Sequence, residues 1–306
     1  MISAARQNAE ALSAENLSAE TLSVVMITKN AERLLDPVLA QASKIASEII
    51  IVDSGSTDKT LKIAKKYTQK ITEVSDWPGF GIQKQRAVEA ASGDWILVLD
   101  ADEIIDQVLL DSLSRIIKTA PEETCDAYEL KRPLVFGGKV LRRSVSLWTL
   151  RLFKKGRGKF TDQKVHEKLV IESHAGTPPK IGRVQQGELL HYSYGSVGDW
   201  LARMQKYTDL FVEECLAKNA SDASREPPSK QSSKQSSVGF AVLSAFFVFI
   251  KVYVFKGAFL EGRMGFVISV HWAIGNYIKY LKLALREDFL REEARQIKAL
   301  KIKEAP

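Results

Sequence analysis

Short apolar runs alternate with amphipathic stretches along the N-terminal third of the chain. Predicted strands lie at residues 23–27, 48–52, 70–74 and 95–99. Predicted helices lie between them, at about residues 36–47, 58–67 and 82–92. Strands that are apolar throughout and alternate with helices are typical of a parallel sheet covered on both faces. The pattern therefore predicts an α/β, Rossmann-like fold with a mostly parallel central sheet.

The alternation ends after residue 102. A predicted helix at about 106–119 is followed by shorter strand-like runs through about residue 193. A stretch rich in Ser, Lys, Gln and Pro then follows, too polar to pack and therefore expected to be a linker. The expected organisation is a flexible arm at 1–21, an α/β domain at 22–195 and a helical region at 196–306 with its polar linker at about 218–237.

The C-terminal region contains two apolar stretches. The first covers residues 238–250 and is interrupted by Lys251, and the second covers residues 265–285 and includes polar residues such as Lys279. A helix that spans a membrane needs roughly 20 apolar residues. Both stretches are therefore predicted to lie in the plane of a membrane or to dock as amphipathic helices, rather than to cross it.

Charge adds information about partners. The 306 residues carry a formal net charge of +7, which favours an anionic partner. Residues 130–161 contain no acidic residue, and aromatic residues such as Phe136 and Trp148 lie among their Lys and Arg residues. This basic segment is either a solvated face or a surface that holds an anionic acceptor or a membrane. Cys125 and Cys215 are too far apart to form a metal-binding motif.

Candidate chemistry begins where the strand at 95–99 ends. Asp100 and Asp102 follow it directly, and residues two apart on an extended backbone point the same way. Two close carboxylates repel each other unless a cation lies between them. Mg²⁺ and Mn²⁺ prefer such oxygen ligands and often bridge to substrate phosphates. The pair therefore indicates a metal site that holds a nucleotide diphosphate, although Asp-x-Asp is also common in turns and helix caps.

A second acidic loop follows the strand at 48–52 and reads Asp53-Ser54-Gly55-Ser56-Thr57-Asp58. It would face the same edge of the sheet as Asp100, where ligands bind in open α/β folds. In isolation it is equally compatible with an ordinary strand–loop–helix joint. The first strand is followed by Thr28-Lys29-Asn30-Ala31 rather than by a Gly-x-Gly-x-x-Gly motif, which argues against a dinucleotide oxidoreductase.

Three ordered motifs together resemble the inverting family 2 glycosyltransferases of the GT-A fold. They are residues 23–30 (SVVMITKN), 50–58 (IIVDSGSTD) and 93–103 (GDWILVLDADE). Within that family, the segments at 83–86, 151–153, 165–167 and 257–283 are similar to the lipopolysaccharide-core glucosyltransferases. The resemblance implies a GT-A domain, here followed by a C-terminal helical, membrane-associated region.

The resemblance also implies roles for individual residues. Asp53 would contact the nucleotide base, with Thr28 and Asn30 at the nucleotide end of the first strand. Asp100 would lie near the ribose and diphosphate, while Asp102 would bind a divalent metal, Mg²⁺ or Mn²⁺. The donor site would be completed by three cationic side chains: Lys84, Arg86 and Arg151.

An inverting transfer needs a base that removes the proton of the acceptor hydroxyl. Glu167 is the predicted base, with His166 orienting it or binding phosphate, although both could instead lie in a surface turn. Many relatives carry a Gln-x-x-Arg-Trp segment beyond the base, but residues 190–194 here read LHYSY, so His191 is a candidate contact of the metal or diphosphate. The missing segment favours the transfer of a single sugar over processive synthesis.

The sequence therefore predicts a metal-dependent transferase that moves a hexose, expected to be glucose, from a UDP-linked donor. The expected acceptor is a membrane-anchored glycolipid such as a lipopolysaccharide core, and the expected location is the cytoplasmic face of a bacterial inner membrane, on an anionic surface. Two alternatives are a polyprenyl-phosphate glycosyltransferase and a non-catalytic carbohydrate-binding or membrane-binding module. Nucleic acid is not an expected partner.

Overall fold

The computed structural model describes residues 20–119, 124–161, 167–173, 176–222 and 237–303, with only the backbone described at 216–222 and 287–303. His166 therefore lies outside the described residues. The chain divides into two compact units. The sheet unit comprises Met1–Val135 and Ser146–Ser193, and the helical unit comprises Phe136–Val145 and Tyr194–Pro306.

The sheet unit begins with four parallel strands in the order β3-β2-β1-β4. These strands are β1 (Leu22–Thr28), β2 (Glu48–Asp53), β3 (Ile71–Glu73) and β4 (Trp95–Asp100). The helices that follow them are α2 (Leu35–Ala42), α3 (Thr60–Ala64), α4 (Phe80–Glu89) and α5 (Gln107–Lys118). Because all four strands run the same way, β1, β2 and β4 end at one edge of the sheet, which is where ligands bind in this class of fold.

The remaining strands extend the sheet beyond β4. β7 (Lys139–Lys154) pairs antiparallel with β4, and the order continues through β6 (Ala127–Phe136), β11 (Leu189–His191) and β5 (Glu103–Ile105). β10 (Ile181–Val184) also pairs with β6, and β8 (Gly158–Phe160) pairs with β9 (Leu169–Ile171) in a separate two-stranded sheet. The fold is thus mixed α/β with a mostly parallel central sheet, as predicted.

Alternating residues of the central strands enter two separate cores. Val24 and Met26 of β1 face one core with helices α2 and α5, whereas Val25 faces the other core with Ala87 and Val88 of α4. This division follows from the two-residue period of an extended chain. Both faces of the sheet are therefore buried, which explains why its parallel strands are apolar at nearly every position.

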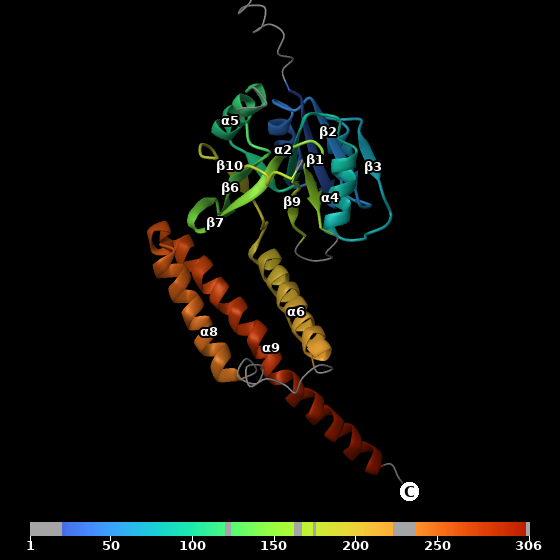
Figure 1. The fold of residues 1–306 in the computed structure, drawn as a ribbon. Helices are drawn as coiled ribbons and strands as arrows, with labels where there is room; N and C mark the ends of the chain where they lie inside the picture. The colour runs from blue at the N-terminus through green and yellow to red at the C-terminus, as the bar shows by residue number, and fades with distance from the viewer. Residues whose placement is uncertain (1–19, 120–123, 162–166, 174–175, 223–236, 304–306) are drawn as a thin grey trace, which may run out of the picture. The chain divides into compact units, whose positions relative to one another are not determined.

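The helical unit contains α6 (Val197–Asp222), α8 (Val238–Ile250), a π-helical turn η2 (Lys251–Phe255), a short helix η3 (Ala258–Glu261) and the long helix α9 (Gly262–Lys303). Figure 1 shows α8 and α6 lying along α9. α6 continues through Asp222, into the first residues of the expected linker, and residues 223–236 lie outside the described chain. The apolar stretch at 265–285 and the charged tail after it form one continuous helix.

Candidate active site

Asp100 and Asp102 lie at the end of β4 but have different partners. The strand ends at Asp100, and Asp102 lies in the turn before β5. Asp100 forms ion pairs with Lys84 (Nζ to Oδ1, 3.0 Å) and Arg151 (Nη2 to Oδ2, 2.6 Å). Asp102 instead faces His191, with 3.6 Å between Nε2 and Oδ2. The two carboxylates therefore have different ion-pair partners, and Asp102 lies beside His191, a second side chain of a metal-ligating type.

Lys84 joins Asp100 to the predicted base. It projects from α4 and is 7 % exposed, and its Nζ lies 3.0 Å from Asp100 and 3.1 Å from Oε1 of Glu167. The backbone of α4 also comes close to the chain around Glu167. A Cβ added to Gly81 would lie 2.2 Å from the carbonyl oxygen of Thr161 and 3.2 Å from Cβ of Glu167, so only glycine fits there. α4 thus positions Glu167 at the edge of the sheet where β4 ends with Asp100.

Two arginines and Glu103 complete a chain of alternating charges. Glu103 is fully buried and forms ion pairs with Arg151 (2.5 Å) and Arg132 (2.6 Å). Nη2 of Arg132 in turn lies 3.1 Å from both ring nitrogens of His191. The side chains form the series Lys84, Asp100, Arg151, Glu103, Arg132, His191 and Asp102.

The same contacts set the ionisation of the two aspartates. Burial disfavours the charged form of Asp100, but the charges of Arg151 and Lys84 outweigh it and hold the pKa of that carboxyl well below its usual value. Burial opposes ionisation of Asp102 as well. The close approach of the His191 ring nevertheless lowers the pKa of Asp102. Both groups are therefore carboxylates at neutral pH.

Asp53 ends β2 and organises the loop that follows it. Its side chain accepts hydrogen bonds from the hydroxyls of Thr28 (2.7 Å) and Ser56 (2.6 Å), and from the backbone N–H groups of Gly55 (3.0 Å) and Ser56 (2.8 Å). The residue is fully buried. A carboxylate has about four acceptor positions, so these bonds use all of them. A direct contact to a nucleotide base stays a prediction, and it requires that one of these bonds be exchanged.

Asn30 contacts the loop after β2 that Asp53 organises, whereas Arg86 lies away from the carboxylate cluster. Asn30 has a left-handed backbone (φ 49°), and its Oδ1 accepts a hydrogen bond from the N–H of Thr57 (2.9 Å). It therefore ties the turn after β1 to the loop after β2. Arg86 forms a double ion pair with Asp76 (2.7 and 2.8 Å), rather than joining Lys84 at the carboxylate cluster.

Glu103 and Arg132 belong to the site but were not predicted from the sequence. Glu103 directly follows Asp102, and this adjacency to the motif is the one feature of the sequence that could have indicated its role. A glutamate at the start of a strand has no other distinctive pattern. Arg132 lies in the basic segment at 130–161, among cations that the sequence does not distinguish. Only the register of β6 beside β11 brings Arg132 to His191.

Asp102 and His191 are the side chains whose chemistry and position fit a divalent metal. Among the described residues, no group of three or more His, Cys, Asp or Glu side chains could hold a metal ion by itself. Mg²⁺ is typically bound through one or two protein ligands together with substrate phosphates and water. A two-ligand site at Asp102 and His191 is therefore consistent with a metal that binds together with a diphosphate donor.

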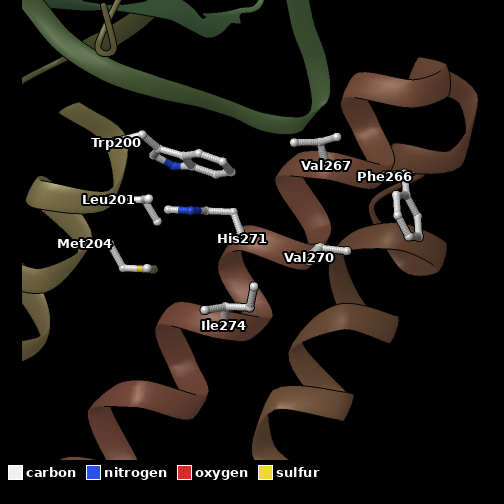
Figure 2. Close-up of a pocket in the computed structure, with 8 residues that line it drawn as sticks. All are labelled: Trp200, Leu201, Met204, Phe266, Val267, Val270, His271 and Ile274. Atoms are coloured by element: carbon white, nitrogen blue, oxygen red, sulfur yellow. The ribbon is translucent and has the colours of Figure 1, made fainter. Parts of the chain in front are cut away.

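The helical unit has a separate apolar cavity of about 180 Å³ between α6 and α9. Figure 2 shows that the ring of Trp200 lies over the ring of His271, and their centroids are 3.5 Å apart. Burial lowers the pKa of His271 to about 4, so its ring is neutral at pH 7. The cavity is lined by Trp200, Leu201, Met204, Phe266, Val267, Val270, His271 and Ile274.

The sheet order and the acidic turn after β4 define the class of protein as a GT-A-type glycosyltransferase. Comparison with protein families agrees, because residues 23–174 match the model of glycosyl transferase family 2. Residues 23–174 therefore belong to this family, and the family prediction from the three sequence motifs is confirmed.

Relatives cover most of the chain. The lipopolysaccharide core biosynthesis glycosyltransferase LpsC of Rhizobium meliloti is 27 % identical over 270 residues, which are 86 % of this chain and 92 % of the relative. An uncharacterized glycosyltransferase of Rickettsia bellii is 27 % identical over 266 residues, 85 % of each chain. Among solved structures, residues 1–349 of S. aureus TarS match with a TM-score of 0.43 and 16 % identity, covering 90 % of this chain and 91 % of TarS.

Proposed function

We propose that this protein transfers a hexose from a UDP-linked sugar to a membrane-anchored glycolipid such as a lipopolysaccharide core, with inversion at the anomeric carbon. The observation that carries this proposal is the charged cluster at the end of β4, in which Lys84 joins Asp100 to Glu167 and Asp102 faces His191. Support for the acceptor class comes from similarity to a lipopolysaccharide core glycosyltransferase over most of both chains.

The charge of the cluster favours a divalent cation. Four acidic side chains (Asp100, Asp102, Glu103 and Glu167) lie with three cations (Lys84, Arg132 and Arg151). Burial raises the pKa of Glu103, and the group is net negative when Glu103 is ionised and His191 is neutral. A nucleotide diphosphate is also negative and would be repelled. A divalent metal at Asp102 and His191 would reverse the sign of the site and stabilise the departing diphosphate.

Glu167 is proposed to act as the base. The acceptor hydroxyl oxygen forms a bond to the anomeric carbon, its proton passes to the carboxylate of Glu167, and the bond from that carbon to the diphosphate breaks. The leaving nucleotide diphosphate takes the bonding electron pair. Lys84 holds Glu167 at 3.1 Å and Asp100 at 3.0 Å, and so fixes the base relative to the end of β4.

Arg151 and the loop around Asp53 are proposed to hold the donor without taking part in proton transfer. Arg151 keeps Asp100 ionised and oriented, which suits a contact to the ribose or diphosphate. The loop after β2 is shaped by the four bonds to Asp53. Arg86 is proposed to bind the donor phosphates only when its ion pair with Asp76 is broken. The proposed location is the cytoplasmic face of a bacterial inner membrane.

A panel of nucleotide sugars tests the proposal directly. The donor should raise the thermal unfolding midpoint in the presence of Mg²⁺ or Mn²⁺, because a ligand that binds only the native protein stabilises it. UDP-glucose is expected to give the largest shift, and chelation of the metal should remove most of it. A panel in which no nucleotide sugar shifts the midpoint, with or without metal, would contradict a donor site at this edge of the sheet.

Asp102→Ala isolates the metal assignment. The variant should lose transfer to a glycolipid acceptor and should bind UDP equally weakly with and without metal. Asp111→Ala, which removes an exposed aspartate of α5, is the matched control and should behave as the wild type. Full activity in purified Asp102→Ala would refute the metal assignment. Polyprenyl phosphate, tested beside a lipopolysaccharide core, distinguishes the two acceptor classes.

A further inference from the structure

The outward face of α8 is apolar and is not covered by protein. Val238, Val242 and Phe246 recur every four residues, so they lie along one side of the helix, and Leu243 and Phe247 lie beside them. Phe246 and Phe247 are 58 % and 60 % exposed, and Phe255 in the turn beyond α8 is 82 % exposed. Contiguous exposed surface of this kind marks a site of contact with a membrane or another protein.

By length and composition, residues Val238–Phe255 could form a helix that crosses a membrane. The arrangement of the helical unit argues against crossing. Tyr280 of α9 packs against Phe240 of α8 (4.9 Å between ring centroids) and against Phe211 of α6 (5.7 Å). α8 and α6 therefore flank α9 at the same level, as Figure 1 shows.

α6 is too polar to share a hydrocarbon layer with α8. Its described side chains include six charged residues over four turns: Asp199, Arg203, Lys206, Asp209, Glu213 and Glu214. Asp209 also forms an ion pair with Lys282 of α9, next to the level of Tyr280. If α8 crossed a bilayer, these charges would enter its interior, where charged side chains are strongly disfavoured.

The turn between α8 and α9 is fixed to a basic hairpin tip. Glu261 of η3 is 6 % exposed and accepts hydrogen bonds from the backbone N–H groups of Arg143 and Ser144 and from the Ser144 hydroxyl. This contact places the tip, residues 139–145, beside the apolar turn that carries Phe255. Exposed cations surround that turn: Lys139, Arg142, Arg143, Lys251, Lys256 and Arg263.

We propose that the helical unit lies flat on an anionic lipid bilayer, with the outer face of α8 and the turn at 254–260 inserted among the lipids and α6 kept in water. The apolar side chains would enter the acyl boundary, and the surrounding Lys and Arg would meet anionic headgroups. The inference rests on the proposed membrane-anchored acceptor, and it makes the protein monotopic. It also gives one partner to two segments that are far apart in the sequence: the tip of the basic segment, residues 139–145, and the apolar stretch after the linker.

Topology is tested with single cysteines. In a background with Cys125→Ser and Cys215→Ser, Ser237→Cys marks the beginning of α8 and Arg263→Cys marks the start of α9, beyond the inserted turn. Sealed membrane vesicles of both orientations are treated with a membrane-impermeant maleimide. Both cysteines should react from the same side of the membrane. Reaction from opposite sides would show that α8 crosses and would overturn the proposal.

Lipid contact is tested by flotation with vesicles of phosphatidylcholine alone or mixed with phosphatidylglycerol. The double variant Phe246→Ser, Phe247→Ser should bind the anionic vesicles roughly tenfold or more weakly than the wild type, since two large apolar side chains are lost from the contact. Val108→Ser and Val170→Ser remove exposed valines of the sheet unit and should bind normally.

Sedimentation of the same proteins without lipid tests the competing explanation, in which the apolar face of α8 contacts a second copy of the chain. Unchanged vesicle binding in the double variant, together with dissociation of an oligomer, would assign the face of α8 to a second copy of the chain and refute lipid contact. Donor binding measured by thermal shift in detergent is recorded in parallel. Failure of the donor site would appear there, whereas failure of the membrane proposal would leave that shift intact.

Discussion

Glu103 is the side chain on which the two arginines of the site converge. It lies fully buried within 2.6 Å of both Arg132 and Arg151, and its Oε2 accepts a hydrogen bond from the backbone N–H of Asp100 (3.1 Å). Arg151 continues to Asp100, and Arg132 continues to His191. One carboxylate therefore positions the partners of both aspartates of the Asp-Ala-Asp motif without itself facing solvent.

Glu103→Gln should destabilise the native protein by about 3 kcal/mol, because removing one partner of a buried ion pair leaves the other charges uncompensated. Urea unfolding measures this change. Glu129→Gln on β6 removes one partner of an ion pair with Arg183 of β10, whose side chain is 54 % exposed, and should stay within about 0.5 kcal/mol of the wild type. Equal stability of the two variants would show that Glu103 is not the centre of the charge network.

Glu167→Gln should lower the turnover number by about two to four orders of magnitude, since the amide cannot accept the acceptor proton. UDP affinity should change little, because Glu167 is assigned to the acceptor side. Steady-state transfer and UDP titration give the two readouts. Glu172→Gln, an exposed glutamate that follows β9, is the control. A large loss of UDP affinity in Glu167→Gln would move this residue to the donor site.

The residue scale also shows what the sequence could and could not predict. The positions of Asp53 and Asp100 follow from apolar strands that end where the polar residues begin. The pairing of Lys84 with Asp100 does not follow, because it depends on how α4 is rotated on the sheet. Arg151 reaches Asp100 from β7, about fifty residues later, through a strand pairing that no local pattern specifies.

At the scale of elements, parallel and antiparallel strands differ in how well they could be predicted. β1, β2 and β4 are buried on both faces and appear in the sequence as continuous apolar runs. β7 has sixteen residues with exposed, intermediate and buried positions mixed, and the next strands of the sheet, β6 and β11, mix intermediate and buried positions without alternation. Local hydrophobic pattern is therefore sufficient for the first half of the sheet and insufficient for the second.

The packing of α6 on α9 should weaken in acid. Burial lowers the pKa of His271 from 6.5 to about 4, so the native ring is neutral while the unfolded ring binds a proton below pH 6.5. The stability that depends on the neutral ring is complete above pH 6.5 and is lost as the pH falls towards 4. At pH 5 the loss should be about 2 kcal/mol.

His271→Phe tests this origin of acid sensitivity. A phenyl ring keeps an aromatic contact with Trp200, which stacks on His271 at 3.5 Å, and it does not titrate. The difference in unfolding free energy between pH 7.5 and pH 5, measured with urea, should be smaller in the variant than in the wild type by about 2 kcal/mol. An identical pH dependence in both proteins would exclude His271 as its source.

At the scale of the whole molecule, the two units have different surfaces. The sheet unit carries the charged cluster, whereas the helical unit carries the exposed apolar face of α8 and, at its hairpin tip, exposed cations. The tip belongs to the helical unit although its residues lie in the middle of the sequence. Sequence reasoning treats the chain as consecutive domains and has no means of assigning such a segment.

This division predicts that salt weakens the binding of the protein to membranes but has little effect on the transfer reaction itself. Raising the ionic strength from about 0.05 M to about 0.5 M shortens the Debye length from roughly 14 Å to roughly 4 Å. Contacts between exposed Lys and Arg and anionic headgroups should weaken, so binding to phosphatidylglycerol vesicles and turnover on an acceptor embedded in them should both fall. Turnover on the same acceptor in neutral detergent micelles should change far less, because the buried ion pairs of Lys84, Arg132 and Arg151 are poorly screened. Parallel loss in vesicles and micelles would place the salt-sensitive step in the active site, and the helical unit would then have no electrostatic part in recruitment.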